Sequence, residues 1–356
     1  MPPKPGKTLR HIVMKTFIIA EAGVNHNGDE KTALALVEAA AKSGADAVKF
    51  QTFSADKLTR KGAAKAEYQR QTTGAGDQHG MLKALEISES LHRRLFAHCR
   101  EFGIEFMSTA FDEGALDFLL ALGIKRIKVP SGEITNAPLL VHMAGKGLPL
   151  IISTGMAELD EVVTAVDTIH AARIAHAFAE PLAEVVTLLH CTSNYPADNA
   201  DVNLRAMNTM ARTTGLRVGY SDHTLGLAVS IGAVALGATV IEKHFTLDRE
   251  LPGPDHRASL EASQFSSLVR QIRDVEAALG SDVKSPTASE LPVRDLVRSS
   301  VTTVRSVAAG VAISKDDIAL LRPGTGIPPF DRDKVIGRKS VRNISAGETL
   351  NWSDLA

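Results

Sequence analysis

Residues 219–246, GYSDHTLGLAVSIGAVALGATVIEKHFT, form the stretch of the chain that indicates its fold most directly. The stretch opens within a strand-type run, RVGYSD, and closes with another, TVIEKHF, and the small apolar residues between them are typical of a helix. The first run is followed by His223, and the second carries His244 near its end. Because a strand–helix–strand unit pairs its strands in parallel, we expect the two imidazoles to meet at one edge.

The same alternation recurs along roughly the first 245 residues, with several of the helix-type segments ending at glycine. Eight strand-type runs can be counted: FIIAEAG, AVKFQT, EFMSTA, RIKVPS, LIISTG, VVTLLHCTS, RVGYSD and TVIEKHF. Eight such units within about 250 residues predict an α/β protein with a (β/α)8 TIM barrel. An open, doubly wound sheet is the alternative, but EAGVNHNG lacks the GxGxxG spacing of its phosphate turn.

The composition of the chain changes after about residue 280. The stretch GSDVKSPTASELPVRD is rich in serine, proline and charge, which predicts a linker over residues 281–296. From 297 to 356, short β-type runs alternate with glycine turns. We therefore expect a catalytic barrel over residues 1–280, the linker, and a small β-rich domain over residues 297–356.

Composition also narrows the class of protein. The chain is 44% apolar and 23% charged, and its net charge of −1 leaves no basic block for nucleic acid or an anionic membrane. No apolar run reaches the roughly 18 residues of a membrane span, and FIIA is too short for a signal-peptide core. Two cysteines, Cys99 and Cys191, fit a reducing compartment. We expect a cytoplasmic protein whose partners are small molecules.

Polar side chains gather at the predicted carboxyl ends of the strands, where TIM barrels build their active sites. Serine and threonine at such places are often helix caps, and a single histidine is more often structural than a ligand. Lys49 and Lys128 are stronger signals, because a lysine inside a barrel strand is rarely buried without an anion. With several hydroxyl groups nearby, they describe a site for phosphate or carboxylate.

The two histidines and the carboxylate beside them indicate a second binding site, next to the anion site. Strand alternation places Glu242 and His244 on one face and Lys243 on the other. Together with His223, they indicate a divalent-cation site that stays partly open to substrate or water. From this chemistry alone, we expect a metal-assisted lyase or transferase that acts on an anionic substrate.

Long motifs spread over nearly the whole chain resemble those of the sialic acid synthase family. They include IAEAGVNHNGD, AVKFQTF, KVPSGEITNAPLL, ISTGMAELDEV, HCTSNYPA, GYSDHTLG, VIEKHFTLD, GPDHRASLE and LRPGTGI. These enzymes join phosphoenolpyruvate to an N-acetylated hexosamine in a TIM barrel, and they carry a C-terminal antifreeze-like (SAF) domain of β-clip fold. The resemblance implies condensation with N-acetylmannosamine and water to give N-acetylneuraminate and phosphate. Legionaminate, made from 2,4-diacetamido-2,4,6-trideoxymannose, is the alternative product.

The resemblance also implies roles for individual residues. His223 and His244 match the ligands of a manganese or magnesium ion. Glu133 matches the acid–base residue, and Glu21 and Lys128 are grouped with it as catalytic. The positions that match substrate contacts are Lys49, Thr109, Ser131, Ser153, Ser193 or Asn194, Tyr195, Glu242, Asp255 and Arg322. Arg322 resembles an arginine that one subunit lends to the other, so a domain-swapped homodimer is implied.

Two other functions remain open from the sequence. A 3-deoxy-heptulosonate-phosphate-type synthase also joins phosphoenolpyruvate to an aldose in a metal-containing barrel, but it would not need the C-terminal module. An inert barrel with a carbohydrate- or ice-binding tail would not need the polar set at the strand ends.

Overall fold

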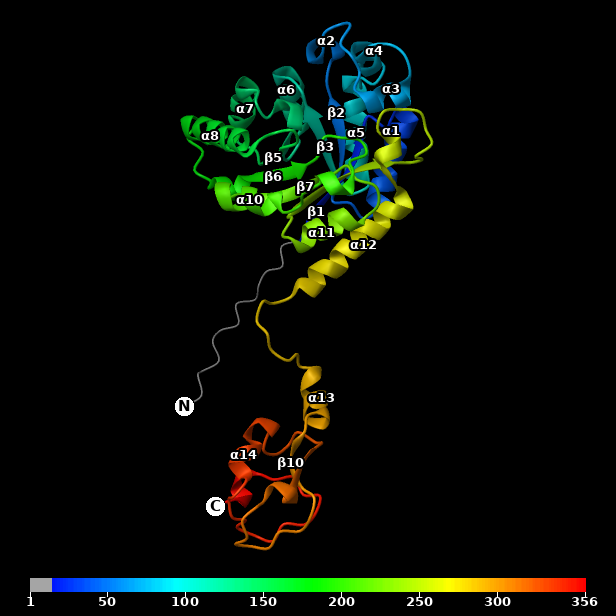
Figure 1. Ribbon diagram of the computed structural model, residues 1–356. Coiled ribbons are helices and arrows are strands. Elements are labelled where there is room, and N and C mark those ends of the chain that lie inside the picture. Colours follow the sequence, from blue (N-terminus) through cyan, green and yellow to red (C-terminus); the bar gives the residue numbers. More distant parts are fainter. Residues whose placement is uncertain (1–14) are drawn as a thin grey trace. The chain divides into compact units, whose positions relative to one another are not determined.

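The computed structural model describes residues 15–356 and divides the chain into two compact units. The first unit ends at Gly280, and the second covers Ser281–Ala356. Figure 1 colours the first unit from blue to yellow and the second from orange to red. Within the described residues, no helix combines the length and apolarity needed to cross a membrane.

The first unit is built on a closed barrel of eight parallel strands. Each strand pairs with the next along the chain, and β1 also pairs with β8, which closes the barrel. The strands are β1 (Phe17–Gly23), β2 (Ala47–Thr52), β3 (Glu105–Ala110), β4 (Ile127–Val129), β5 (Leu150–Ser153), β6 (Val186–Cys191), β7 (Arg217–Asp222) and β8 (Val240–Thr246), followed by the short β9 (Leu260–Glu261). The predicted TIM-barrel fold is confirmed.

Helices connect the strands and surround them (Figure 1). They are α1 (Glu30–Lys42), α2 (Ala55–Leu58), α3 (Glu67–Thr73), α4 (Gln78–Lys83), α5 (Glu89–Glu101), α6 (Glu113–Leu122), α7 (Ala137–Ala144), α8 (Leu159–Ala175), α9 (Leu182–Val185), α10 (Ala206–Thr214), α11 (Ala228–Ala235) and α12 (Ala262–Leu279). Their starts follow from side-chain caps: Asp29, Ser88 and Asp112 accept hydrogen bonds from backbone N–H groups in the first turns of α1, α5 and α6.

Strand alternation divides the core of this unit into two parts. One set of strand residues packs outward against the helices in a large apolar cluster. The other set points into the barrel and forms an apolar layer of Ile19, Ala47, Met107, Ile151, Leu189 and Val240. Two residues further along the same strands, the interior is polar, at Glu21, Lys49, Thr109, Ser153, Cys191 and Glu242. The apolar layer therefore forms the floor of a polar site at the carboxyl ends of the strands.

The second unit has its own small core. It contains α13 (Glu290–Val297), the antiparallel pair β10 (Ser300–Thr303) and β11 (Ile318–Leu321), and α14 (Arg332–Val335). Isolated β-bridges and 3-10 turns complete it around buried residues that include Val301, Ile327 and Leu350. Much of the stretch expected to be a linker, residues 281–296, is irregular, but it groups with this unit and enters α13 at Glu290.

Candidate active site

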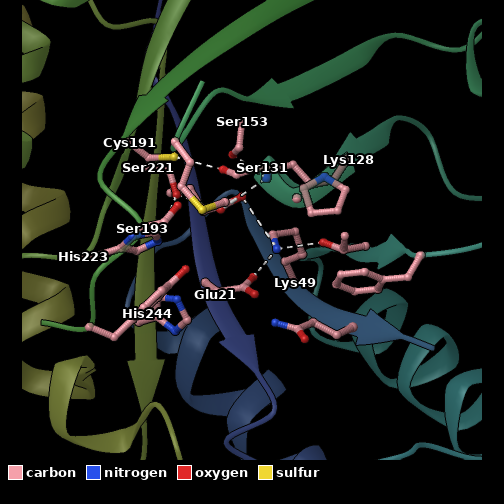
Figure 2. Close-up of a pocket in the computed structure, with 18 of the residues that line it drawn as sticks. Glu21, Lys49, Lys128, Ser131, Ser153, Cys191, Ser193, Ser221, His223 and His244 are labelled. Atoms are coloured by element: carbon pink, nitrogen blue, oxygen red, sulfur yellow. Dashed lines mark hydrogen bonds and ion pairs between the residues drawn. The ribbon is translucent and has the colours of Figure 1, made fainter. Parts of the chain in front are cut away.

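A cavity of about 470 Å³ lies at the carboxyl ends of the barrel strands. It is lined by side chains from all eight strands or the loops that follow them. The predicted site residues among them are Glu21, Lys49, Thr109, Lys128, Ser131, Ser153, Ser193, Tyr195, His223, Glu242 and His244. Figure 2 shows the two histidines on one side of this group, with Lys49 and Lys128 on the other.

Two buried lysines and two buried carboxylates form a charge network on the cavity wall. The Lys49 ammonium lies 2.6 Å from Glu21 Oε2 and 3.7 Å from Glu242 Oε2. The Lys128 ammonium lies 3.6 Å from Glu242 Oε1, which also accepts a hydrogen bond from Ser221 at 3.0 Å. All four charged side chains are at most 6% exposed, so each depends on the others for its charged state.

The network shifts the pKa values of its members in different directions. Burial raises the pKa of Glu21 to about 7, because desolvation outweighs the attraction to Lys49. Desolvation also acts on Glu242, but the charges of Lys128 and Lys49 outweigh it and hold the pKa of Glu242 below its usual range. Burial lowers the pKa of Lys128, and Glu242 opposes that shift. The Lys128 ammonium is thus poorly neutralised, which suits it to bind a substrate anion.

Hydroxyl groups complete an anion cradle around the lysines. Lys49 donates to Thr109 Oγ1 at 3.0 Å, and Lys128 donates to Ser153 Oγ at 2.7 Å. Ser131 Oγ accepts a hydrogen bond from the N–H of Gly155 at 3.1 Å. A Cβ atom on Gly155 would collide with Ser193 Oγ and lie 2.9 Å from Ser131 Oγ, so only glycine fits beside these hydroxyls. The lysines and hydroxyls thus offer positive charge and hydrogen-bond donors to an anion, beside the carboxylates of Glu21 and Glu242.

The two predicted metal ligands face each other across adjacent strands. The ring centroids of His223 and His244 are 5.4 Å apart, and both side chains are buried. Nδ1 of His223 lies 2.6 Å from the carbonyl oxygen of Thr192. A carbonyl only accepts, so Nδ1 carries the proton and Nε2 keeps its lone pair. Burial lowers the pKa of His223 to about 4 and that of His244 well below its usual value, so both rings are neutral at pH 7.

These two imidazoles fit the part of a cation site that the protein supplies. Among residues 15–356, Nδ1 of His244 is one of the buried side-chain atoms without a hydrogen-bond partner, which leaves its lone pair available to a cation. The same residues contain no group of three or more His, Cys, Asp or Glu side chains arranged to hold a metal ion. A divalent cation here would take the two imidazoles as protein ligands and fill its other positions with substrate or water.

Four predicted residues lie outside the described lining of the cavity. Glu133 follows the cradle in the 3-10 turn Ser131–Glu133, and its carboxylate accepts a hydrogen bond from Asn136 at 2.6 Å. Asn194 is exposed, and its side-chain oxygen accepts from the N–H of Tyr195. Of the pair left open by the sequence, Ser193 is therefore the residue that faces the cavity.

The other two differ in position. Asp255 is buried, and its Oδ2 lies 3.9 Å from Nδ1 of His244, next to the cavity wall. Burial raises the pKa of Asp255 to about 6. Arg322 directly follows β11 in the second unit and is exposed.

The cavity also has lining residues to which the resemblance assigned no role. Gln51 lies in β2, Phe111 and Met156 follow β3 and β5, and Ser221 is the penultimate residue of β7, beside Glu242. Three more, Tyr68, Gln69 and Gln78, come from the segment between β2 and α5. The signal available for Tyr68 was its rarity, because it is one of only three tyrosines and sits in a polar stretch, AEYQRQ.

Family comparisons match both units of the chain. The NeuB family matches residues 36–284, and the SAF domain matches residues 298–356. The first match covers most of the barrel, and the second covers the small β-rich module.

Similar proteins match nearly the whole chain. The N,N'-diacetyllegionaminic acid synthase of Legionella pneumophila is 55% identical over 96% of this chain and 95% of its own length. The enzyme of the same name from Campylobacter jejuni is 42% identical over 94% of this chain and 99% of its own. The crystal structure of an N-acetylneuraminic acid synthetase from Leptospira borgpetersenii is 33% identical. It matches with a TM-score of 0.69 over 79% of this chain and 90% of that one.

Proposed function

Because this chain belongs to the NeuB family and carries a SAF domain at its C-terminal end, we propose that it is an N,N'-diacetyllegionaminic acid synthase. It condenses phosphoenolpyruvate with 2,4-diacetamido-2,4,6-trideoxymannose and water, and it releases phosphate. The cavity that unites two buried lysines, a set of hydroxyls and two neutral imidazoles carries this proposal. The match to SAF over residues 298–356 counts against a heptulosonate-phosphate-type synthase, which would not need that module.

The acceptor sugar proposed here differs from the one that the sequence alone favours. N-acetylmannosamine was expected first from the sequence and the diacetamido sugar second. The two diacetyllegionaminic acid synthases share 55% and 42% of their residues with this chain, against 33% for the N-acetylneuraminic acid synthetase. The proposal therefore takes the diacetamido sugar as acceptor, with N-acetylmannosamine second.

The anion cradle accounts for the binding of phosphoenolpyruvate. Lys49 and Lys128 compensate the charges of its phosphate and carboxylate, and Thr109, Ser131 and Ser153 supply hydroxyl donors around them. These groups are fixed by the strands before substrate arrives, so little reorganisation is needed as charge moves during the reaction. The enol carbon is thereby held where it can attack the acceptor aldehyde.

The acceptor side of the cavity contains the histidine pair. A divalent cation held by His223 and His244, Mn²⁺ or Mg²⁺, would polarise the aldehyde and orient it. Tyr195 packs against His223 with ring centroids 4.1 Å apart and forms part of the adjoining wall. Glu133 remains the proposed proton-transfer residue for water addition and phosphate release. Its carboxylate accepts a hydrogen bond from Asn136, two residues after the end of the cradle at Ser131.

Product analysis tests this function. Purified enzyme is incubated with phosphoenolpyruvate, Mn²⁺ and each acceptor in turn, and the products are identified by mass spectrometry. The diacetamido sugar is expected to give diacetyllegionaminic acid and phosphate at the higher kcat/KM. A higher kcat/KM with N-acetylmannosamine would make that sugar the preferred acceptor. The absence of product with both acceptors would overturn the proposed reaction.

Metal removal is expected to abolish turnover. Protein stripped with EDTA and desalted should lose at least about 100-fold in phosphate release, because two neutral imidazoles alone do not polarise an aldehyde. Activity should return on addition of Mn²⁺ or Mg²⁺. Metal analysis of the same samples provides the control, and full turnover by protein shown to be metal-free would remove the cation from the mechanism.

The domain-swapped dimer and the cytoplasmic location also remain proposals. Arg322 is exposed in the second unit, as a residue that serves a partner subunit would be. Light scattering on the purified protein distinguishes a dimer from a monomer. Cys99 and Cys191 are both free thiols, which supports a reducing compartment.

A further inference from the structure

One wall of the cavity comes from the segment that joins β2 to α5, residues 53–88. This segment contributes Ala66, Tyr68, Gln69 and Gln78 to the lining. The charged groups of the cavity are instead carried by the barrel strands, at Glu21, Lys49, Lys128 and Glu242. In the part of the chain that the structure describes, the segment therefore presents only apolar, phenolic and amide groups to a ligand.

Tyr68 is the residue of this segment whose ring contacts the wall formed by Tyr195 and His223. Its ring packs on the ring of Tyr195, with centroids 5.2 Å apart, and Tyr195 in turn packs on His223 at 4.1 Å. The three rings form a continuous aromatic column that runs from the segment to a proposed metal ligand. Gln69 donates to the hydroxyl of Tyr68 at 3.3 Å and restrains the ring further.

The segment is held in place by an apolar cluster that packs Phe53 and Leu85 against Val24 and Phe111, and by polar contacts of its own. The Lys65 side chain is buried, and its ammonium donates to Thr73 Oγ1, Gly74 O and Ala75 O at 3.0–3.3 Å. Its charge is thus used within the segment. Asp77 accepts from the N–H groups of Gly62 and Gly80.

By contrast, every residue of α3, the helix that carries Tyr68, is exposed or half-buried. The presence of an aromatic side chain at Tyr68 is therefore not explained by packing in a hydrophobic core. The residue lines the cavity instead.

We propose that Tyr68, supported by Gln69 and Gln78, is a specificity-determining residue for the acceptor sugar and selects a neutral, acetamido-substituted hexose. This inference rests on the proposed function and adds the surface that recognises the sugar. Aromatic rings pack well against acetyl methyl groups and deoxy positions, and side-chain amides pair with acetamido N–H and C=O groups. A sugar phosphate would face a wall without a cation, and its charge would be left unpaired there.

The test measures acceptor and phosphoenolpyruvate kinetics separately in Tyr68→Ala and Tyr68→Phe. Loss of the ring is expected to raise the KM of the diacetamido acceptor by about tenfold or more, the usual effect of deleting an apolar contact with substrate. The KM of phosphoenolpyruvate should change by less than about threefold, because the anion cradle does not include this segment. Tyr68→Phe keeps the ring and should stay within about threefold of wild type. Gln71→Ala, an exposed change on the same helix, is the matched control.

Three results would overturn the inference: an unchanged acceptor KM in Tyr68→Ala, an equal rise in both KM values, or a wild-type preference for a 6-phosphorylated acceptor. Ligand-observed NMR of the acceptor, recorded without phosphoenolpyruvate, separates this inference from the proposed reaction. If wild type turns over neither acceptor, the reaction fails. In that case, acceptor binding that Tyr68→Ala weakens would still support the specificity role, and binding that it leaves unchanged, or no binding to wild type, would overturn it.

Discussion

Replacing Lys128 with methionine is expected to lower turnover by about 10²–10³-fold, the loss typical of removing one preorganised electrostatic group from an active site. Lys128 is buried, donates to Ser153 at 2.7 Å and lies 3.6 Å from Glu242. Its ammonium is the less neutralised of the two cavity lysines, because Glu21 and Glu242 both flank Lys49. Methionine keeps the apolar stem and removes only the charge and its hydrogen bonds.

Phosphate release with both substrates saturating is the measurement, together with the KM of phosphoenolpyruvate, which should rise because Lys128 is proposed to bind the anion. Lys125→Met is the matched control, since Lys125 lies exposed three residues earlier and should leave both constants unchanged. Circular dichroism checks that Lys128→Met is folded. A folded Lys128→Met enzyme that keeps its rate within about fivefold would show that the cradle binds its anion elsewhere.

The residues that the sequence placed well are those whose position follows from strand alternation. In a barrel, every second residue points inward, so the polar residue two places after Ile19, Ala47 or Ile151 had to enter the mouth. The same alternation put Glu242 and His244 in the cavity and Lys243 on the opposite face. His223 and His244 met because parallel strands joined by one helix are neighbours.

Positions beyond the strand ends were less predictable, because loops follow local contacts instead of a period. The strand that carries Lys128 ends at Val129, and the 3-10 turn that follows directs Glu133 toward Asn136. The segment that bears Tyr68 contains three helices of four to seven residues, which are too short to show an apolar stripe. Its placement involves the carbonyl contacts of Lys65 and a small apolar cluster with Val24 and Phe111, neither of which leaves a periodic pattern in the sequence.

A second strong effect is expected at the ion pair behind the histidines. Lys243 Nζ lies 2.9 Å from Asp222 Oδ2, and both side chains are fully buried between the barrel and its helices. The ammonium also donates to the carbonyl of Thr224 at 2.6 Å, and Asp222 accepts from the N–H of Thr224 at 2.8 Å and from Ser230 at 2.5 Å. These contacts satisfy both charges and join β7, β8 and α11 directly beside His223 and His244.

Lys243→Met should therefore lower the free energy of unfolding by about 3–5 kcal/mol, because the carboxylate of Asp222 would remain buried without its cation. Asp222→Asn should lower the free energy of unfolding by a similar amount. The double variant should lose less than the sum of the two single losses, because it leaves no buried charge without a partner. Chemical denaturation of the three variants measures this. Lys42→Met, which breaks the exposed pair with Glu38, should change stability by less than about 1 kcal/mol. If the two single changes were additive in the double variant, the pair would contribute no coupling, and the registry of the two histidine-bearing strands would have to be fixed by the backbone ladder alone.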